Sequence, residues 1–212
     1  MSEWWSYRLS DFLLFSPQTY FRLFELHNQA LWPWQIAASI AGLAMLALVG
    51  QRPALLIAGA AWLLVAWLWL FENYATINWA ATWLAAGFAL QGLLLWIAVF
   101  TARLRPFSGL GRPFGFLLMV CALVLQPLLP LLLERPWQQG EVFAITPGPT
   151  VVATLGLLLA QRAPWWLLVL PLLWCAIDGA TLWTLQAPEA ALLPAAGLLT
   201  LLLRALPLRR RD

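Results

Sequence analysis

Long apolar runs alternate with short polar stretches along almost the whole chain. Each run is close to the roughly twenty residues that an α-helix needs to cross the hydrocarbon core of a bilayer. The pattern therefore predicts an all-α, polytopic membrane helix bundle with seven transmembrane helices. The predicted spans are Leu31–Val49, Ala54–Phe71, Trp79–Phe100, Phe114–Leu133, Val142–Ala160, Trp165–Leu185 and Ala190–Leu206.

Residues 1–30 precede the first span and have a different pattern. Aromatic and leucine side chains alternate there with polar ones, which is typical of an amphipathic helix lying in the headgroup plane. Ser16 and Pro17 offer an N-cap followed by proline at the first helical position. His27, the single histidine of the chain, lies in this segment, and we expect it to be a plain polar residue more often than a ligand.

Three units follow from these patterns. Residues 1–30 form an interfacial amphipathic segment, residues 31–207 form the seven-helix transmembrane domain, and residues 208–212 form a basic cytoplasmic tail. If residues 10–31 cross the membrane instead of lying on it, the count becomes eight and the N-terminus moves inside.

The charged residues are sorted between alternate loops. All twelve basic residues are arginine, and nine of them lie in the loops and tail of one side. Because arginine and lysine are enriched in cytoplasmic loops, this sorting predicts an N-terminus outside and a C-terminus inside. We expect the bacterial inner (plasma) membrane as the location, with membrane lipid as a partner. The net charge of +3 belongs to this bias, so no nucleic acid is expected to bind.

Several classes of function are disfavoured by what the chain contains. It is 63% hydrophobic and 10% charged, which leaves no room for a soluble domain. It has no glycine-rich phosphate loop and no hydrolase or metalloprotease motif, and without lysine it cannot form a retinal Schiff base. Cys121 and Cys175 fall inside spans without metal-ligand spacing. We therefore expect neither an enzyme nor a metal site, and the sequence identifies no cofactor.

Asp178 is the ionisable residue predicted to lie deep in the membrane, within the sixth span. An unpaired aspartate at the centre of a span costs about 3 kcal/mol, so it must face a polar partner or a cavity. The favoured interpretation is a structural hydrogen bond to a neighbouring helix, and the alternative is a carboxylate that handles protons or cations. Gln126 also lies mid-span, where amides usually hold helices together.

The fifth predicted span contains the sequence Pro147-Gly148-Pro149, which cannot lie in a helix interior because each proline lacks an N–H. We expect the chain to dip in from outside, turn at Thr146–Thr150, and begin a half-helix at Pro149 beside a polar cavity. In the alternative, Val142–Thr150 lies over the outer surface. The candidate binding residues are Thr146, Gly148, Thr150, Asp178 and Gln126.

Several short motifs occur in order along the chain: Asn28-Gln29-Ala30-Leu31-Trp32-Pro33, Ile77-Asn78-Trp79-Ala80-Ala81, Phe88-Ala89-Leu90-Gln91, Pro147-Gly148-Pro149-Thr150 and Pro171-Leu172-Leu173-Trp174. Over nearly its whole length the chain resembles an uncharacterised bacterial multi-pass integral membrane protein family of unknown function. The resemblance implies that the proline turn is a family feature. The family pattern has a cysteine where this chain has Gly148, which argues against a thiol-based role here. The resemblance implies no activity.

Two functions remain open. The first is an accessory or structural subunit of a bacterial membrane protein complex, contacting partner subunits, lipid or pigment. The alternative is a small membrane transporter or binding protein for an ion or small molecule, with its site at the broken fifth span and Asp178. The small size and few polar groups favour the first, and the broken span favours the second.

Overall fold

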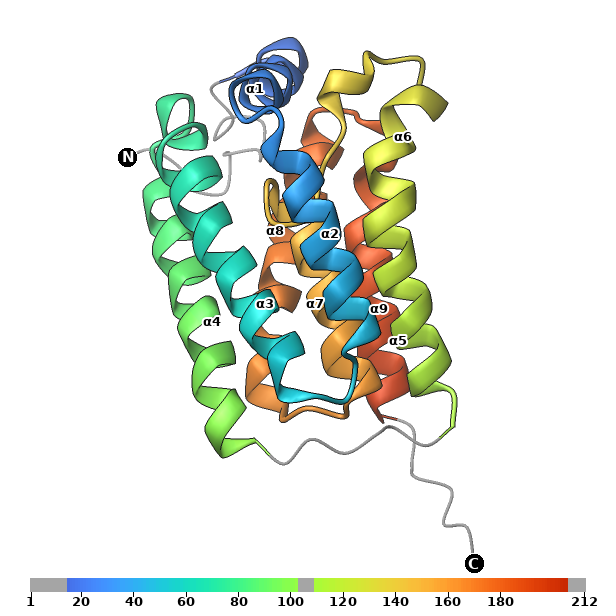
Figure 1. The fold of residues 1–212 in the computed structure, drawn as a ribbon. Helices are drawn as coiled ribbons and strands as arrows, with labels where there is room; N and C mark the ends of the chain where they lie inside the picture. The colour runs from blue at the N-terminus through green and yellow to red at the C-terminus, as the bar shows by residue number, and fades with distance from the viewer. Residues whose placement is uncertain (1–14, 103–108, 206–212) are drawn as a thin grey trace, which may run out of the picture.

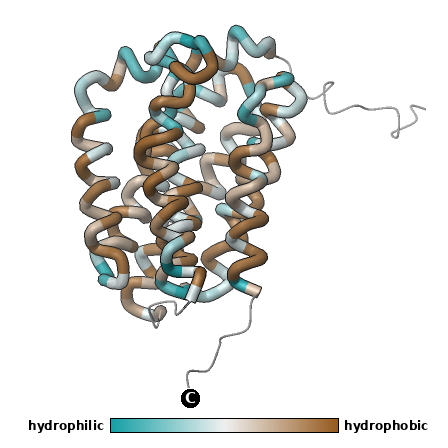
Figure 2. Tube along the Cα trace, turned by 90° about the vertical axis from the view of Figure 1, so that its right-hand side faces the viewer, coloured by the Kyte–Doolittle hydropathy of each residue, from teal (hydrophilic) through white to brown (hydrophobic). Residues whose placement is uncertain are grey.

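The computed structural model describes residues 15–102 and 109–205. These ranges are helical and contain no strand, so the all-α prediction is confirmed. The helices stand upright beside one another, with polar residues gathered at the two ends and apolar residues between them (Figures 1 and 2). The predictions for residues 1–14 and for the tail at 208–212 lie outside the described residues.

Five helical segments are long and apolar enough to cross a membrane, and they coincide with the second, third, fourth, sixth and seventh predicted spans. They are Arg52–Thr76, Ala81–Thr101, Gly111–Leu132, Trp165–Thr184 and Pro188–Ala205. Their parts are α3 (Arg52–Leu64), the π-helical η3 (Val65–Phe71), η4 (Tyr74–Thr76), α4 (Ala81–Thr101), α5 (Gly111–Val120), the π-helical η5 (Cys121–Leu125), α6 (Gln126–Leu132), η7 (Trp165–Leu168), α8 (Val169–Thr184), η8 (Pro188–Ala191) and α9 (Leu192–Ala205). By length and composition, these helices are consistent with a membrane protein.

The first predicted span is shorter than expected. Its helix, α2 (Trp34–Ala47), has 14 residues and is bent by 94° against the preceding helix α1 (Pro17–Ala30). The predicted start of α1 is confirmed, because the Ser16 hydroxyl accepts a hydrogen bond from the Thr19 N–H at 3.2 Å. The chain turns before Trp34, so α1 crosses the end of the bundle that α2 enters (Figure 1).

The fifth predicted span contains α7 (Pro147–Ala160), a 14-residue helix in which every residue is buried. The helix begins at Pro147 and not at Pro149 as predicted. Both prolines fit its first turn, because the N–H groups there have no acceptor within the helix. A Cβ on Gly156 would lie 2.5 Å from the Gly115 carbonyl oxygen, so glycine lets α5 and α7 approach closely. With α2 and α7 both short, the count of seven transmembrane helices stays a prediction.

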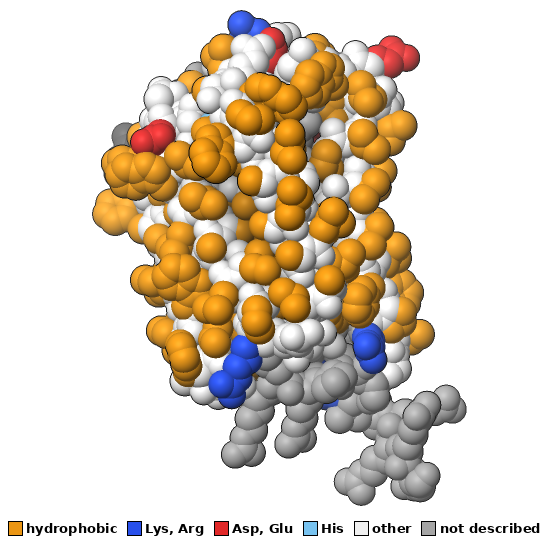
Figure 3. Space-filling view, in the orientation of Figure 1, with side chains coloured by type: hydrophobic (Ala, Val, Ile, Leu, Met, Phe, Trp, Pro, Cys, Tyr) orange, Lys and Arg blue, Asp and Glu red, His pale blue; other side chains and the backbone are white. Residues whose placement is uncertain are grey.

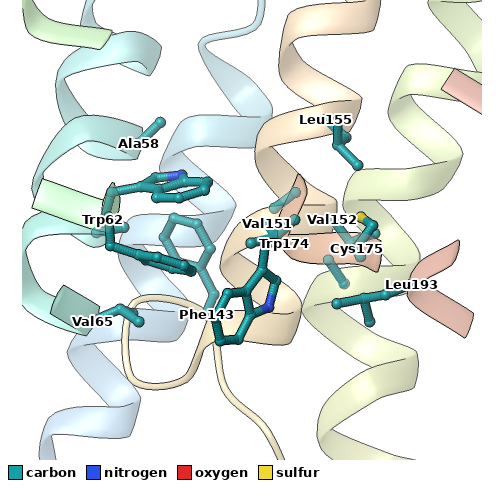
Figure 4. Packing of buried hydrophobic residues seen from close by; sticks show 14 of the residues in the cluster. Ala58, Trp62, Val65, Phe143, Val151, Val152, Leu155, Trp174, Cys175 and Leu193 are labelled. Carbon is teal, nitrogen blue, oxygen red and sulfur yellow. The ribbon is translucent and has the colours of Figure 1, made fainter. Parts of the chain in front are cut away.

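An aromatic cluster packs the helices around α7. The rings of Trp62 and Phe88 are 4.2 Å apart, and those of Phe88 and Trp174 are 4.8 Å apart. Phe143, from the segment that leads into α7, lies between Trp62 and Trp174 in Figure 4. Mid-span polar groups link helices here as well, since the Gln91 side-chain amide donates to the Leu167 carbonyl at 3.0 Å. The core therefore holds α7 and its entry segment from several sides.

The two ends of the bundle differ in charge (Figure 3). One end, which we call the arginine end, carries Arg52, Arg112, Arg162 and Arg204 among the described residues. The opposite end, which we call the acidic end, carries Arg22, Glu25, Glu72, Glu134, Arg135, Glu141 and Glu189. The described arginines are thus sorted by end as the loops predict, while the orientation of the chain in a membrane stays a prediction.

Candidate functional site

The entry to α7 is a tight turn whose polar groups have partners within it. Ala144 adopts a left-handed backbone conformation with a φ of 62°, and its N–H donates to the Thr150 hydroxyl at 2.9 Å. The Val142 N–H donates to the Thr146 hydroxyl at 3.0 Å. Each hydroxyl also donates to a main-chain carbonyl, that of Thr146 in the case of Thr150. The threonines therefore stabilise a conformation that an L-residue adopts only at a cost.

Glu141 occupies the N-terminus of α7. Its Oε2 accepts a hydrogen bond from the Gly148 N–H at 3.1 Å. A negative charge there also interacts favourably with the helix dipole. A Cβ on residue 148 would lie 2.5 Å from this oxygen, so glycine is needed for the carboxylate to approach. The N–H of Gly148, one of the candidate binding residues, is thus bound by Glu141, which was not among those candidates.

A small cavity lies beside Glu141, between α1, α6 and the start of η8. Its volume is about 20 Å³, enough for about one water molecule or a small ion. We call it the polar cavity. It is lined by Tyr20, Phe21, Phe24, Gln126, Leu129, Pro130, Arg135, Gln139, Glu141, Leu182 and Glu189.

Arg135 ties the walls of the polar cavity together. Its guanidinium forms an ion pair with Glu189 at the start of the last helical segment. The same group lies over the Phe21 ring, 4.0 Å from the ring centroid, and so contacts α1. Charge-assisted hydrogen bonds and cation–π contacts are both strengthened away from water. Arg135 therefore holds α1 over the cavity.

Three oxygen atoms in the cavity wall are buried without a hydrogen-bond partner. They are Gln126 Oε1, Gln139 Oε1 and Glu189 Oε2. Gln126 as a whole is only 4% exposed. Leaving a buried acceptor unpaired costs roughly 1–3 kcal/mol. Arg135 Nε, a donor in the same wall, is also buried without a partner, so the unpaired side-chain groups of the cavity are three acceptors and one donor.

Carboxylates outnumber arginine around the cavity. Asp178 in α8 is 8% exposed, so it lies within the bundle as predicted, and it interacts electrostatically with Glu141 and Glu189. Burial is the main cause that raises the pKa of Glu141 to about 7; the nearby Glu189 charge adds to the rise, and the Gly148 N–H and Arg135 oppose it. Near pH 7 the Glu141 carboxyl group is therefore divided between its protonated and its ionised form.

The predicted site residues fall into two groups. Gln126 lines the polar cavity, and Asp178 lies near its carboxylates. Thr146, Gly148 and Thr150 form the cap and first turn of α7 and do not line the cavity. Within residues 15–102 and 109–205, no three His, Cys, Asp or Glu side chains lie together in a way that would hold a metal ion. Any cation here would depend on the amide oxygens as well as on carboxylates.

His27 fastens α1 to the entry of α7. The geometry fits a neutral ring whose Nε2–H donates to the Ile145 carbonyl at 3.2 Å and whose Nδ1 accepts from the Asn73 amide at 3.0 Å. Burial lowers the pKa of His27 to about 4, against a smaller opposing effect of the bond to Ile145. His27 is thus a buried, neutral, structural residue, which its position in an amphipathic segment did not reveal.

Comparison with known proteins places the chain in a family. A family model described as a family of unknown function, DUF6064, matches residues 17–211. Because the match covers most of the chain, the protein belongs to this family. No curated protein and no solved structure matches the chain.

Proposed function

We propose that this member of the DUF6064 family is a non-enzymatic membrane protein that binds a small cation in the polar cavity and serves cation- or proton-coupled transport. The observation that carries the proposal is the set of three buried, unpaired oxygens of Gln126, Gln139 and Glu189. Glu141, Glu189 and one arginine line the cavity, and Asp178 interacts electrostatically with both glutamates, so carboxyl groups outnumber cationic side chains there.

The chemistry of the cavity favours a hard cation of about the size of water. Amide and carboxylate oxygens are the ligands that hard cations prefer. Buried negative charge is costly unless a cation or a proton neutralises it. Since the pKa of Glu141 is about 7, a bound cation and a proton compete near neutral pH. Na⁺ and hydronium both bind oxygen ligands of this kind, and proton release on addition of Na⁺ distinguishes them.

The position of the cavity fits uptake from the acidic end. It lies at the start of α7, a buried helix of 14 residues that is shorter than a full span, and broken helices form the binding sites of many transporters. The sorting of arginines favours a model in which the acidic end faces outward across a bacterial inner membrane, with seven spans.

Proton release on addition of salt tests the proposal. The purified chain in detergent, weakly buffered at pH 7, is titrated with NaCl while its pH is recorded, with choline chloride as the blank. A Na⁺ site releases protons from Glu141, and Glu141→Gln abolishes the release. The control Glu72→Gln alters an exposed carboxylate at the same end and leaves the release unchanged.

Two further results separate the remaining outcomes. If Na⁺ releases no protons but acid–base titration finds a group near pH 7 that Glu141→Gln removes, the ligand is the proton alone. If neither signal is present, the proposal is wrong.

An accessory-subunit role is the second candidate. Broadly exposed tryptophans at the acidic end favour it, because large aromatic side chains suit contacts with another membrane protein; they are Trp32, Trp34, Trp67, Trp79, Trp83, Trp137 and Trp183. Purification from native membranes in a mild detergent tests this role. A stoichiometric partner subunit supports it, and a chain that purifies alone argues against it.

A further inference from the structure

A groove at the bend between α1 and α2 has a different character from the polar cavity. It lies between this bend, α6 and η6 (Trp137–Gln139), and its volume is about 780 Å³. This volume is in the range of ligand pockets, roughly 300–1,000 Å³. We call it the elbow groove. None of its lining residues is charged, and its wall is mostly apolar.

Two amides of the elbow groove have fixed orientations. The Asn28 Nδ2 donates to the carbonyls of Gln138 at 2.7 Å and Gly140 at 2.8 Å. The Gln35 Nε2 donates to the Asn28 carbonyl at 2.7 Å. Both nitrogens are therefore committed to the main chain. The opposite atoms, Asn28 Oδ1 and Gln35 Oε1, are buried and have no partner in the described chain.

The groove also has a polar-to-apolar direction. Trp32 and Trp137 are each 62% exposed, and exposed tryptophans mark the headgroup level of a bilayer. Leu128 and Leu131, which lie on α6 before the turn to Trp137, are exposed apolar residues of the same groove. It therefore runs from the headgroup level into the hydrocarbon.

We propose that the elbow groove binds one phospholipid. Its acyl chain lies along Leu128 and Leu131, and its headgroup donates hydrogen bonds to Asn28 Oδ1 and Gln35 Oε1. Because these atoms are acceptors, the headgroup must carry N–H or O–H donors, as ethanolamine and glycerol headgroups do and choline does not. The lack of charged lining residues means that selection depends on these donors and not on net charge. This inference is independent of the cation site.

A second groove, on the other side of α2, is lined by apolar residues only. Its volume is about 590 Å³, and it is lined by apolar residues of α2 and α3 and by Phe143, Ala144 and Ile145. No unpaired side-chain amide lines it. We expect this second groove to hold acyl chains without headgroup preference.

Lipid retention tests the proposal. The full chain is reconstituted with equal amounts of phosphatidylethanolamine and phosphatidylcholine of identical acyl chains, returned to detergent and examined by native mass spectrometry. We expect about one tightly held lipid per chain, with phosphatidylethanolamine favoured about tenfold because choline leaves the acceptors unpaired. No retained lipid, or equal retention of the two, would overturn the proposal.

Two variants and one control variant locate the lipid. Leu131→Trp fills the elbow groove and should remove the retained lipid, whereas Leu132→Trp, the same change at a neighbouring exposed position outside this groove, should not. Gln35→Met removes the Oε1 acceptor, together with the Nε2 bond to the Asn28 carbonyl, without filling the groove, so it should keep a lipid but reduce the headgroup preference severalfold. Retention by Leu131→Trp, or an unchanged preference in Gln35→Met, contradicts the assignment.

Discussion

The first turn of α7 and the polar cavity are neighbouring buried polar regions that share Glu141, yet their hydrogen bonding differs. In the turn, the hydroxyls of Thr146 and Thr150 each accept one hydrogen bond and donate another. In the cavity, Gln126, Gln139 and Glu189 each leave an oxygen without a partner. The saturated polar groups hold the shape of the turn, whereas the unpaired oxygens are the ligands of the proposed cation site. The two regions therefore differ in structural residues and proposed binding residues.

Lowering the pH should produce the largest change in stability. The change acts through His27, whose hydrogen bond to Ile145 joins α1 to the entry of α7. The pKa of His27 falls from 6.5 in the unfolded chain to about 4 in the folded one, so the unfolded state binds the proton first. Its stabilising contribution is full above pH 6.5 and is lost as the pH falls to 4, a change of about 3 kcal/mol.

Unfolding in detergent between pH 7.5 and 4 measures this effect as the difference between wild type and His27→Gln. The subtraction matters because Glu141, with its raised pKa, changes stability in the opposite direction over part of the same range. A difference that does not vary with pH would contradict the assignment of a buried, neutral His27.

Gly148→Ala should disturb both regions at once. The added Cβ would lie 2.5 Å from Glu141 Oε2, so the carboxylate must shift away from the Gly148 N–H that it accepts from. We expect a loss of about 2 kcal/mol in unfolding free energy and loss of Na⁺-linked proton release. Gly87→Ala is the control, because open space surrounds that Cβ position. Equal behaviour of the two variants would show that Glu141 does not depend on Gly148.

Thr150→Val should destabilise the turn without affecting the cavity. It leaves the Ala144 N–H unpaired, at a cost of about 1–2 kcal/mol. Thr184→Val, which removes a hydroxyl that donates only to the Ala180 carbonyl, should cost less than about 0.5 kcal/mol. Thermal unfolding compares the two. If Thr150→Val weakened cation binding as strongly as it weakens the fold, the separation of the two regions would fail.

Gln126→Leu should have the smallest effect on stability and a clear effect on binding. Replacing a buried amide whose oxygen is unpaired removes a desolvation penalty, so the unfolding free energy should be unchanged or slightly higher. Loss of one oxygen ligand should weaken Na⁺ binding by about tenfold. Calorimetric titration measures it. A marked loss of stability in this variant would mean that Gln126 is structural.

Much of the fold was predictable because apolar run length determines where helices cross a bilayer. The five long helical segments coincide with predicted spans, and Ser16 caps α1 as its sequence indicates. The 94° bend before Trp34 lies where the surface segment was predicted to give way to the first span, but run length overestimated that span, because α2 has only 14 residues where Leu31–Val49 was predicted. Pro147 and Pro149 indicated the break at α7, but its start was misplaced because both prolines fit a first turn.

The candidate site was predicted only in part, because depth along a span identifies Asp178 and Gln126 whereas tertiary contacts determine the rest. Glu141 and Glu189 lie in connecting segments, where acidic residues are common, so nothing local distinguishes them. The fold brings them under α1 through Arg135 and Phe21, which are far apart in the sequence. One signal was present in the sequence. Glu141 lies seven residues before Gly148, and the free N–H groups in the first turn of a helix favour an anionic partner.

The most direct test of the cation site is an experimental structure of the chain soaked in Tl⁺, a heavy substitute for a monovalent cation, at pH 8. We expect an anomalous peak in the polar cavity, in contact with Gln126 Oε1, Gln139 Oε1 and Glu189 Oε2, and its loss at pH 5, where Glu141 is protonated. A cavity without the peak at pH 8, with these oxygens hydrogen-bonded to protein groups, would contradict it.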